Sequence, residues 1–190
     1  MSETSIMNPT PTRYTWTYDE YARLPDDGNR YEVIDGEVLV TPAPSTTHQH
    51  IAGTLYIRLR RFVEEHDLGV VLPDVDLLFV EGQFLRPDLL FVPDAARDGI
   101  TSRGVHKTPG LVVEVLSPSS GSIDRVKKPG RYRDFGVPEY WVVDPEARAV
   151  WVWRFAGAAE PERVEGRLSW KPEGAGAALV LEMEELFRPM

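Results

Sequence analysis

Helically spaced apolar residues in the first third of the chain predict two helices of different length. Apolar side chains recur at the spacing of one helical face at Ile51, Leu55, Leu59 and Phe62. This pattern predicts an amphipathic helix that follows a loop over residues 42–47 and ends near Glu65. Thr17 and Glu20 have the spacing of a capping box, which predicts a short helix over about residues 18–24.

Most of the other apolar stretches have the length and composition of strands. Residues 31–40 predict a hairpin, because apolar residues flank Asp35 and Gly36, a pair that tolerates the positive φ angles of a type I′ turn. In this register Glu32 lies opposite Leu39. Further strands are expected at 70–80, 84–92, 111–116, 139–144, 149–155 and 178–181.

Strands therefore predominate, with helices near both ends of a central sheet. Residues 123–135 are polar and expected to be helical in part, and a short helix is expected over 184–187. The pattern indicates an α/β (α+β) fold built from packed layers. A length of 190 residues with 42% hydrophobic content suits a single domain over residues 15–190, preceded by a flexible tail over 1–14.

The composition excludes several classes of protein. The chain has no cysteine, which rules out a disulfide framework, a thiolate zinc site and a cysteine nucleophile. This absence fits a reducing compartment, so we expect a cytoplasmic protein. The apolar runs are of strand length, and the first residues lack the pattern of a signal peptide, so we expect no membrane association.

The charge is distributed unevenly along the chain. The formal net charge is −9, which by itself disfavours a nucleic-acid ligand. Residues 97–133 hold eight basic and three acidic residues, so this segment carries +5 and the remainder carries −14. The basic segment fits either a phosphate-facing patch or an ordinary solvated helix face, and charge alone does not decide between them.

Two carboxylates stand beside apolar runs. Glu114 lies within the strand expected at 111–116, where its same-face neighbours Val112 and Leu116 are apolar, so it requires a cation. That cation is either a metal ion or a buried Arg or Lys. Asp88 follows Pro87 at the opening of another strand, and carboxylates on neighbouring strands can meet at one end of a sheet. A hard divalent ion would relieve their repulsion.

Five stretches of the chain together resemble a known family. They are residues 31–38, 44–48, 86–88, 111–118 and 136–145, and the similarity extends over about residues 15–155. A Pro-Asp pair followed by an apolar strand with an internal Glu resembles the PD-(D/E)xK signature of nucleases. More specifically, the chain resembles the Uma-type family of restriction endonucleases.

The resemblance implies a restriction-endonuclease-like core, a mixed central β-sheet flanked by helices, often assembled as a homodimer. It implies that Asp88 and Glu114 bind Mg²⁺ or Mn²⁺ and that Glu32 is an additional acid at the same site. The signature lysine, two positions after the second acid, is replaced here by Leu116. In the Uma-type family a lysine four residues before a Tyr takes its place, which points to Lys128.

Lys128 is followed directly by Pro129, which disfavours helical geometry in the residue before it. We therefore expect Lys128 to lie just outside a helix that begins near Pro129, and Lys127 remains a competitor for the same role. His48 and His50 are expected to be surface residues near a helix start, and the resemblance implies only a supporting role for His48.

The resemblance implies a hydrolase, a Mg²⁺-dependent endodeoxyribonuclease that hydrolyses phosphodiester bonds in nucleic acid, with DNA as the default substrate. Two alternatives stay open. One is a non-catalytic nucleic-acid-binding domain with the same fold. The other is a partner-binding protein in which Arg86 and Arg125 neutralise the acids.

Overall fold

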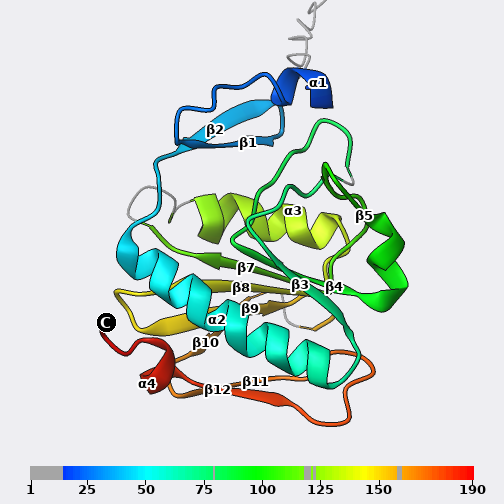
Figure 1. The fold of residues 1–190 in the computed structure, drawn as a ribbon. Coiled ribbons are helices and arrows are strands. Elements are labelled where there is room, and N and C mark those ends of the chain that lie inside the picture. Colours follow the sequence, from blue (N-terminus) through cyan, green and yellow to red (C-terminus); the bar gives the residue numbers. More distant parts are fainter. Residues whose placement is uncertain (1–14, 79, 118–120, 122, 158–159) are drawn as a thin grey trace, which may run out of the picture.

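Six strands form the mixed central sheet of the molecule, in the order β10-β9-β8-β7-β4-β3 (Figure 1). A computed structural model describes residues 15–78, 80–117, 121, 123–157 and 160–190, so the expected tail over 1–14 lies outside the described residues. The strands are β3 Gly69–Pro73, β4 Leu89–Pro93, β7 Leu111–Val115, β8 Glu139–Asp144, β9 Ala149–Arg154 and β10 Glu162–Val164. Only the β7–β8 pair is parallel among these neighbours.

The central strand β7 is buried along its whole length. Leu111, Val113 and Val115 join the core beneath helix α2, Thr46–Glu65, whose apolar face lies against the sheet. Val112 joins the second core, on the side of helix α3, Lys128–Asp134. Because side chains alternate along a strand, Glu114 faces the same side as Val112 and therefore faces α3.

The predicted hairpin is present as a separate two-stranded sheet, β1 Arg30–Ile34 and β2 Glu37–Thr41. Glu32 pairs with Leu39, as expected. The turn residues Asp35 and Gly36 have φ angles of 56° and 80°, the left-handed conformation that a type I′ turn requires.

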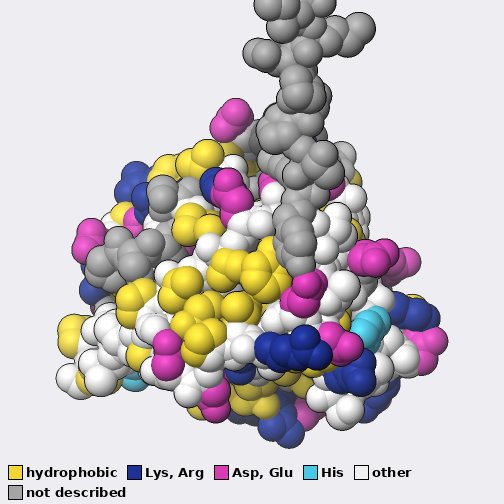
Figure 2. All heavy atoms as spheres, turned by 90° about the horizontal axis from the view of Figure 1, so that it is seen from above, with side chains coloured by type: hydrophobic (Ala, Val, Ile, Leu, Met, Phe, Trp, Pro, Cys, Tyr) yellow, Lys and Arg dark blue, Asp and Glu magenta, His cyan; other side chains and the backbone are white. Residues whose placement is uncertain are grey.

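The hairpin is joined to the rest of the fold through a small apolar core. Val33 exchanges backbone hydrogen bonds with Phe84, and both pack with Tyr21 of helix α1, Tyr18–Tyr21. The capping box of Thr17 and Glu20 is present, although α1 ends earlier than expected. Seen from the hairpin end, apolar side chains gather over the hairpin, with acidic and basic side chains interspersed around them (Figure 2).

Two of the expected strands are shorter than predicted. The strand expected over 70–80 ends at Pro73, because Asp74 takes a φ of 50° and turns the chain away from the sheet. The strand expected over 84–92 begins at Leu89, since Pro87 interrupts the ladder. The apolar residues between these strands form isolated bridges, in which Leu77 pairs with Leu85 and with Val105 and Val33 pairs with Phe84.

The remaining elements lie at the edges of the fold. The chain between β4 and β7 forms the 3₁₀ helix η1 Asp94–Gly99 and the short strands β5 Ile100–Thr101 and β6 Gly104–Val105. At the C-terminal end β11 Arg167–Trp170 pairs with β12 Leu179–Glu182, and α4 Met183–Leu186 follows. Strands β10 and β11 were not predicted. No helix among the described residues is long and apolar enough to cross a membrane.

Two glycines are expected to respond oppositely to substitution by alanine. Gly69 has a φ of 144°, and an added Cβ would lie 2.2 Å from the carbonyl oxygen of Val92. Gly69→Ala should therefore destabilise the protein by about 2–4 kcal/mol. Gly53 lies inside α2 with no atom within 4 Å of the added Cβ, so Gly53→Ala should stabilise it by ~0.5–1 kcal/mol. Denaturant unfolding of both variants measures these effects, and equal signs would contradict the backbone geometry described here.

Candidate active site

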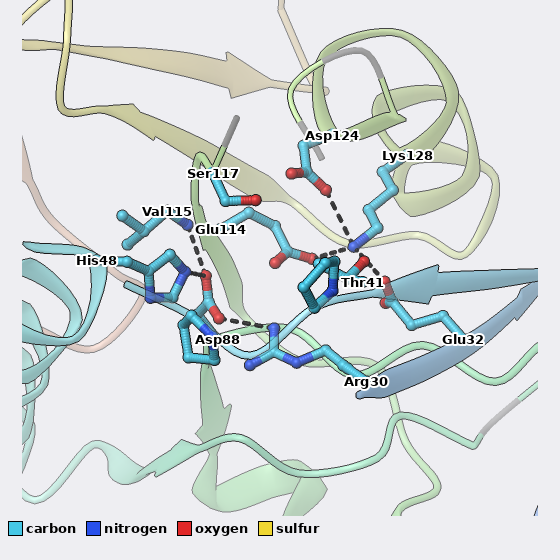
Figure 3. Close-up of a pocket in the computed structure, with 12 residues that line it drawn as sticks. Arg30, Glu32, Thr41, His48, Asp88, Glu114, Val115, Ser117, Asp124 and Lys128 are labelled. Atoms are coloured by element: carbon cyan, nitrogen blue, oxygen red, sulfur yellow. Dashed lines mark hydrogen bonds and ion pairs between the residues drawn. The ribbon is translucent and has the colours of Figure 1, made fainter. Parts of the chain in front are cut away.

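Asp88 is buried and held by three donors (Figure 3). Its Oδ1 accepts a hydrogen bond from Arg30 Nη1 at 2.8 Å. Its Oδ2 lies 3.0 Å from His48 Nε2 and accepts from the backbone N–H of Val115 at 2.7 Å. Burial raises the pKa of Asp88, but the hydrogen bond from His48, the charge of Arg30 and the Val115 N–H outweigh it, and the pKa lies below its usual value. Asp88 is therefore an ionised and well-fixed carboxylate.

The strand register explains this placement. Leu89 of β4 pairs with Val113 of β7, so the residue before β4 lies beside the end of β7. The N-cap Ser45 starts α2 so that His48 falls in its first turn, and the Ser45 side chain accepts from the His48 N–H at 3.2 Å. The expectation that His48 is a surface residue is wrong, because this turn packs over Asp88.

Lys128 is buried among three carboxylates (Figure 3). Its Nζ lies 2.8 Å from Glu114 Oε1, 2.9 Å from Glu32 Oε2 and 3.1 Å from Asp124 Oδ1. Burial lowers the pKa of Lys128, but the three carboxylates raise it by more than burial lowers it. The pKa of Lys128 therefore lies well above its usual value. The ammonium group is charged, and it contacts Glu114 and Glu32, two of the acids predicted from the sequence.

Lys128 does not lie outside the helix, contrary to expectation. It is the first residue of α3, and a π-helical turn, η2 Ile123–Lys127, precedes it directly. The turn keeps the backbone helical into α3, and Pro129 is tolerated because it falls in the first turn. Lys127 points away from the site and pairs with Glu37 Oε2 on the hairpin at 2.8 Å. Of the two candidate lysines, the structure brings Lys128 to the acids.

Glu114 is the site carboxylate whose charged form is disfavoured by its surroundings. Burial raises its pKa; Lys128 lowers it, while Asp124, Asp88 and Glu32 raise it further, and the resulting pKa is well above the usual value. Tyr132 donates a hydrogen bond to Glu114 Oε1 at 3.2 Å. Glu114 Oε2 accepts no hydrogen bond from the described part of the chain.

The site as a whole has an excess of negative charge. Four buried carboxylates converge on it, those of Glu32, Asp88, Glu114 and Asp124. Two permanent cations, Lys128 and Arg30, face them, which leaves a net charge of −2 when all four acids are ionised and His48 is neutral. They line a small pocket that is partly open to solvent. A site of this charge favours an additional cation.

Two members of the site were missed by sequence reasoning. Arg30 stands two residues before Glu32 on the same strand, a spacing that puts both side chains on one face. Asp124 stands four residues before Lys128, the spacing of a helical ion pair. By contrast, Arg86 pairs with Asp74 and Arg125 pairs with Asp144, so neither neutralises the site acids as one alternative expected.

The residues present fit a hard divalent ion through two carboxylates. Among the described residues, no three His, Asp or Glu side chains form a metal-binding cluster by themselves. Mg²⁺ commonly uses one or two protein carboxylates and takes its other ligands from water and substrate phosphate. Asp88 and Glu114, at adjoining strand ends and with a free oxygen on Glu114, provide such a pair.

Comparison with known proteins identifies the family of the chain. Residues 18–184 match the Uma2 family, described as "Putative restriction endonuclease". The chain belongs to the Uma2 family. The resemblance predicted from five short motifs is thereby confirmed.

One protein of similar sequence and one solved structure are similar to this Uma2 protein. An uncharacterized protein of Synechocystis sp., sll1609, is 25% identical over 115 residues, which cover 60% of this chain and 65% of that protein. The match thus spans less than two thirds of the relative's length. A crystal structure described as a putative nuclease belonging to DUF820 from Anabaena variabilis superposes with a TM-score of 0.74. That comparison covers 90% of this chain and 97% of the other at 22% identity, and it confirms the mixed α/β fold class.

The two metal-ligand candidates should affect stability in opposite directions when no metal is present. Glu114→Gln should raise the melting temperature at neutral pH, because the elevated pKa of Glu114 means that stability is lost as the pH rises above 4.5. Asp88→Asn should cost about 1–3 kcal/mol, because it breaks charge-assisted hydrogen bonds to buried donors.

Thermal melts in a chelator from pH 3 to 8 separate these effects. The gain of Glu114→Gln should grow with rising pH. The loss of Asp88→Asn should shrink as the pH falls below 3.8 toward the lowered pKa of Asp88, because the wild-type carboxylate becomes protonated there. A large loss of stability in Glu114→Gln would show that Glu114 serves mainly as a structural ion-pair partner.

Proposed function

We propose that this Uma2-family protein is a metal-dependent endonuclease that hydrolyses phosphodiester bonds in DNA, with Mg²⁺ or Mn²⁺ as its cofactor. The observation that carries the proposal is the convergence of Asp88, Glu114, Glu32 and Lys128 in one buried, negatively charged cavity. Asp88 directly precedes β4, Glu114 lies in β7, Glu32 in the hairpin and Lys128 in α3. Acids that can hold a divalent ion beside a lysine fit metal-assisted phosphoryl chemistry.

Each residue has a distinct role in this mechanism. Asp88 and Glu114 would hold the ion, and Arg30 and His48 fix the orientation of Asp88. A bound divalent ion polarises the phosphate and lowers the pKa of an attacking water. Lys128 would present its ammonium group to the phosphate oxygens, where negative charge develops during hydrolysis.

Substrate binding should be weak and sensitive to salt. The face seen in Figure 2 has acidic and basic side chains interspersed, without one continuous basic surface. The net charge of −9 adds a general repulsion of nucleic acid. The basic segment over 97–133 is the proposed source of phosphate contacts. A cytoplasmic homodimer remains our expectation for the assembly and its location.

A second proposal is a non-catalytic domain of the same fold that binds nucleic acid or a protein partner. It is favoured by the ion pairs that already occupy the acids, those of Lys128 with Glu114 and Glu32 and that of Arg30 with Asp88. Calorimetric titration with Mn²⁺ distinguishes the two proposals. If the protein is the enzyme, the wild type should bind Mn²⁺, and the variants Asp88→Asn and Glu114→Gln should not. If it is a salt-bridged scaffold, the wild type should bind no Mn²⁺.

Activity should depend on Lys128 and not on its neighbour. With plasmid DNA and Mn²⁺ at low salt, we expect nicking or cutting that Lys128→Ala reduces by about 10²–10³-fold. Mn²⁺ affinity should be retained or increased in Lys128→Ala, because the ammonium group competes for Glu114. The matched control Lys127→Ala removes an exposed lysine paired with Glu37 and should at most weaken substrate binding.

The reverse pattern for the two lysines would refute the assignment of Lys128. Absence of cleavage on every form of DNA and RNA, with Mn²⁺ bound, would favour the binding domain. Cleavage should be strongest at low salt, because the net charge of −9 leaves little reserve for phosphate binding.

A further inference from the structure

We infer that Asp124 is a positioning residue that holds the Lys128 ammonium group in place independently of Glu114. The inference rests on the proposed function, in which Glu114 also serves a metal ion. It concerns a residue that neither the sequence motifs nor the family comparison singles out. Its support comes from the geometry of the turn that carries Asp124, from its burial and from its partners.

The first observation is the contact itself. Asp124 is 2% exposed, and its Oδ1 lies 3.1 Å from Lys128 Nζ on the side of the ammonium away from the hairpin (Figure 3). Glu32 reaches the same nitrogen from β1 at 2.9 Å. The lysine therefore lies between one carboxylate from the hairpin and one from its own helical segment.

The second observation is that the backbone of Asp124 is fixed for this contact. Its carbonyl oxygen accepts a hydrogen bond from the Tyr140 hydroxyl of β8 at 2.9 Å. Because Pro129 has no backbone N–H, it cannot donate a hydrogen bond to a carbonyl group of the preceding turn. The π-helical turn is thus tied to the central sheet through a fully buried tyrosine, which also packs against Tyr132 with ring centroids 4.7 Å apart. π-helical turns inside helices often mark functional positions.

The third observation is that the Asp124 carboxylate serves no other structural contact within the described part of the chain. Among the described residues its carboxylate accepts no hydrogen bond from a backbone N–H, and Oδ1 is buried without any hydrogen bond of good geometry. Asp144 shows the contrast, since it accepts from the N–H groups of Glu146 and Ala147 and so shapes a turn. The cation that offsets the burial of the Asp124 charge is Lys128.

These observations matter because, in the proposed function, Glu114 binds both Lys128 and a metal ion. A divalent ion on Glu114 would draw on the carboxylate that also binds Lys128, and it would repel the ammonium group. Glu32 is fixed by the backbone N–H of Arg86 at 2.9 Å and remains available to Lys128. Asp124, attached to the same helical segment as the lysine, keeps the ammonium from turning away when Glu114 is shared. Its loss should thus reduce turnover without removing a metal ligand.

The test compares Asp124→Asn, which keeps the shape and removes the charge, with Asp124→Glu, which keeps the charge. Asp134→Asn is the matched control, because Asp134 is an exposed acid of α3. With saturating Mn²⁺ and DNA, Asp124→Asn should lower kcat by about 10- to 100-fold. KM and the Mn²⁺ dissociation constant should stay at their wild-type values, Asp124→Glu should recover part of the rate, and the control should behave as wild type.

Loss of Mn²⁺ binding in Asp124→Asn would overturn the inference by making Asp124 a ligand. An unchanged kcat would overturn it by making the contact irrelevant. If the wild-type protein cleaves no nucleic acid, the proposed function fails, and a thermal double-mutant cycle of Asp124→Asn with Lys128→Met still decides the positioning role. Asp124→Asn should lower the melting temperature when it is introduced into the wild type, but not when it is introduced into Lys128→Met. Lys128→Gln serves as a second background in which the same result is expected. Additive losses would overturn the inference.

Discussion

One buried ammonium group joins three parts of the fold that backbone hydrogen bonds leave separate. Glu32 belongs to the isolated hairpin, Glu114 to the central sheet and Asp124 to the turn before α3, and Lys128 contacts all three. A buried charge without such partners costs several kcal/mol, so each element must be in place before the lysine can be buried. The same cluster has more acid than base, which creates the demand for a further cation. The proposed affinity for metal would thus have the same electrostatic origin as the cohesion of the fold.

Sequence patterns predicted the parts of the fold that depend on local periodicity. The hairpin register, the long helix over residues 46–65 and the apolar strand around Glu114 follow from spacing alone, because one face of each must be buried. The strand expected over 70–80 was too long, since a run of apolar residues does not show where Asp74 turns the backbone. Strands β10 and β11 are three and four residues long, too short for alternation to be distinguished from a polar linker.

The candidate site was predicted only in part, for a similar reason. Glu114 was singled out because its own neighbours could not solvate it, and Asp88 because it opens a strand that can lie beside that of Glu114. Their partners come from elsewhere in the chain, and no local pattern reveals that Arg30 lies against Asp88. Lys128 was expected outside the helix because Pro129 was considered alone. The π-helical turn, stabilised from a distant strand by Tyr140, is a tertiary effect that overrides the local preference.

The separateness of the hairpin has a consequence for how the candidate site is assembled. The central sheet and α2 bury their own cores and need no strand pairing with the hairpin. The hairpin is attached by its bridge to Phe84 and by ion pairs such as that between Asp35 and Arg131. Local opening of this segment would remove Arg30 and Glu32 together while the sheet stays folded. The folded sheet would then keep Asp88, Glu114, Asp124 and Lys128 together while it lacks the two side chains from the hairpin.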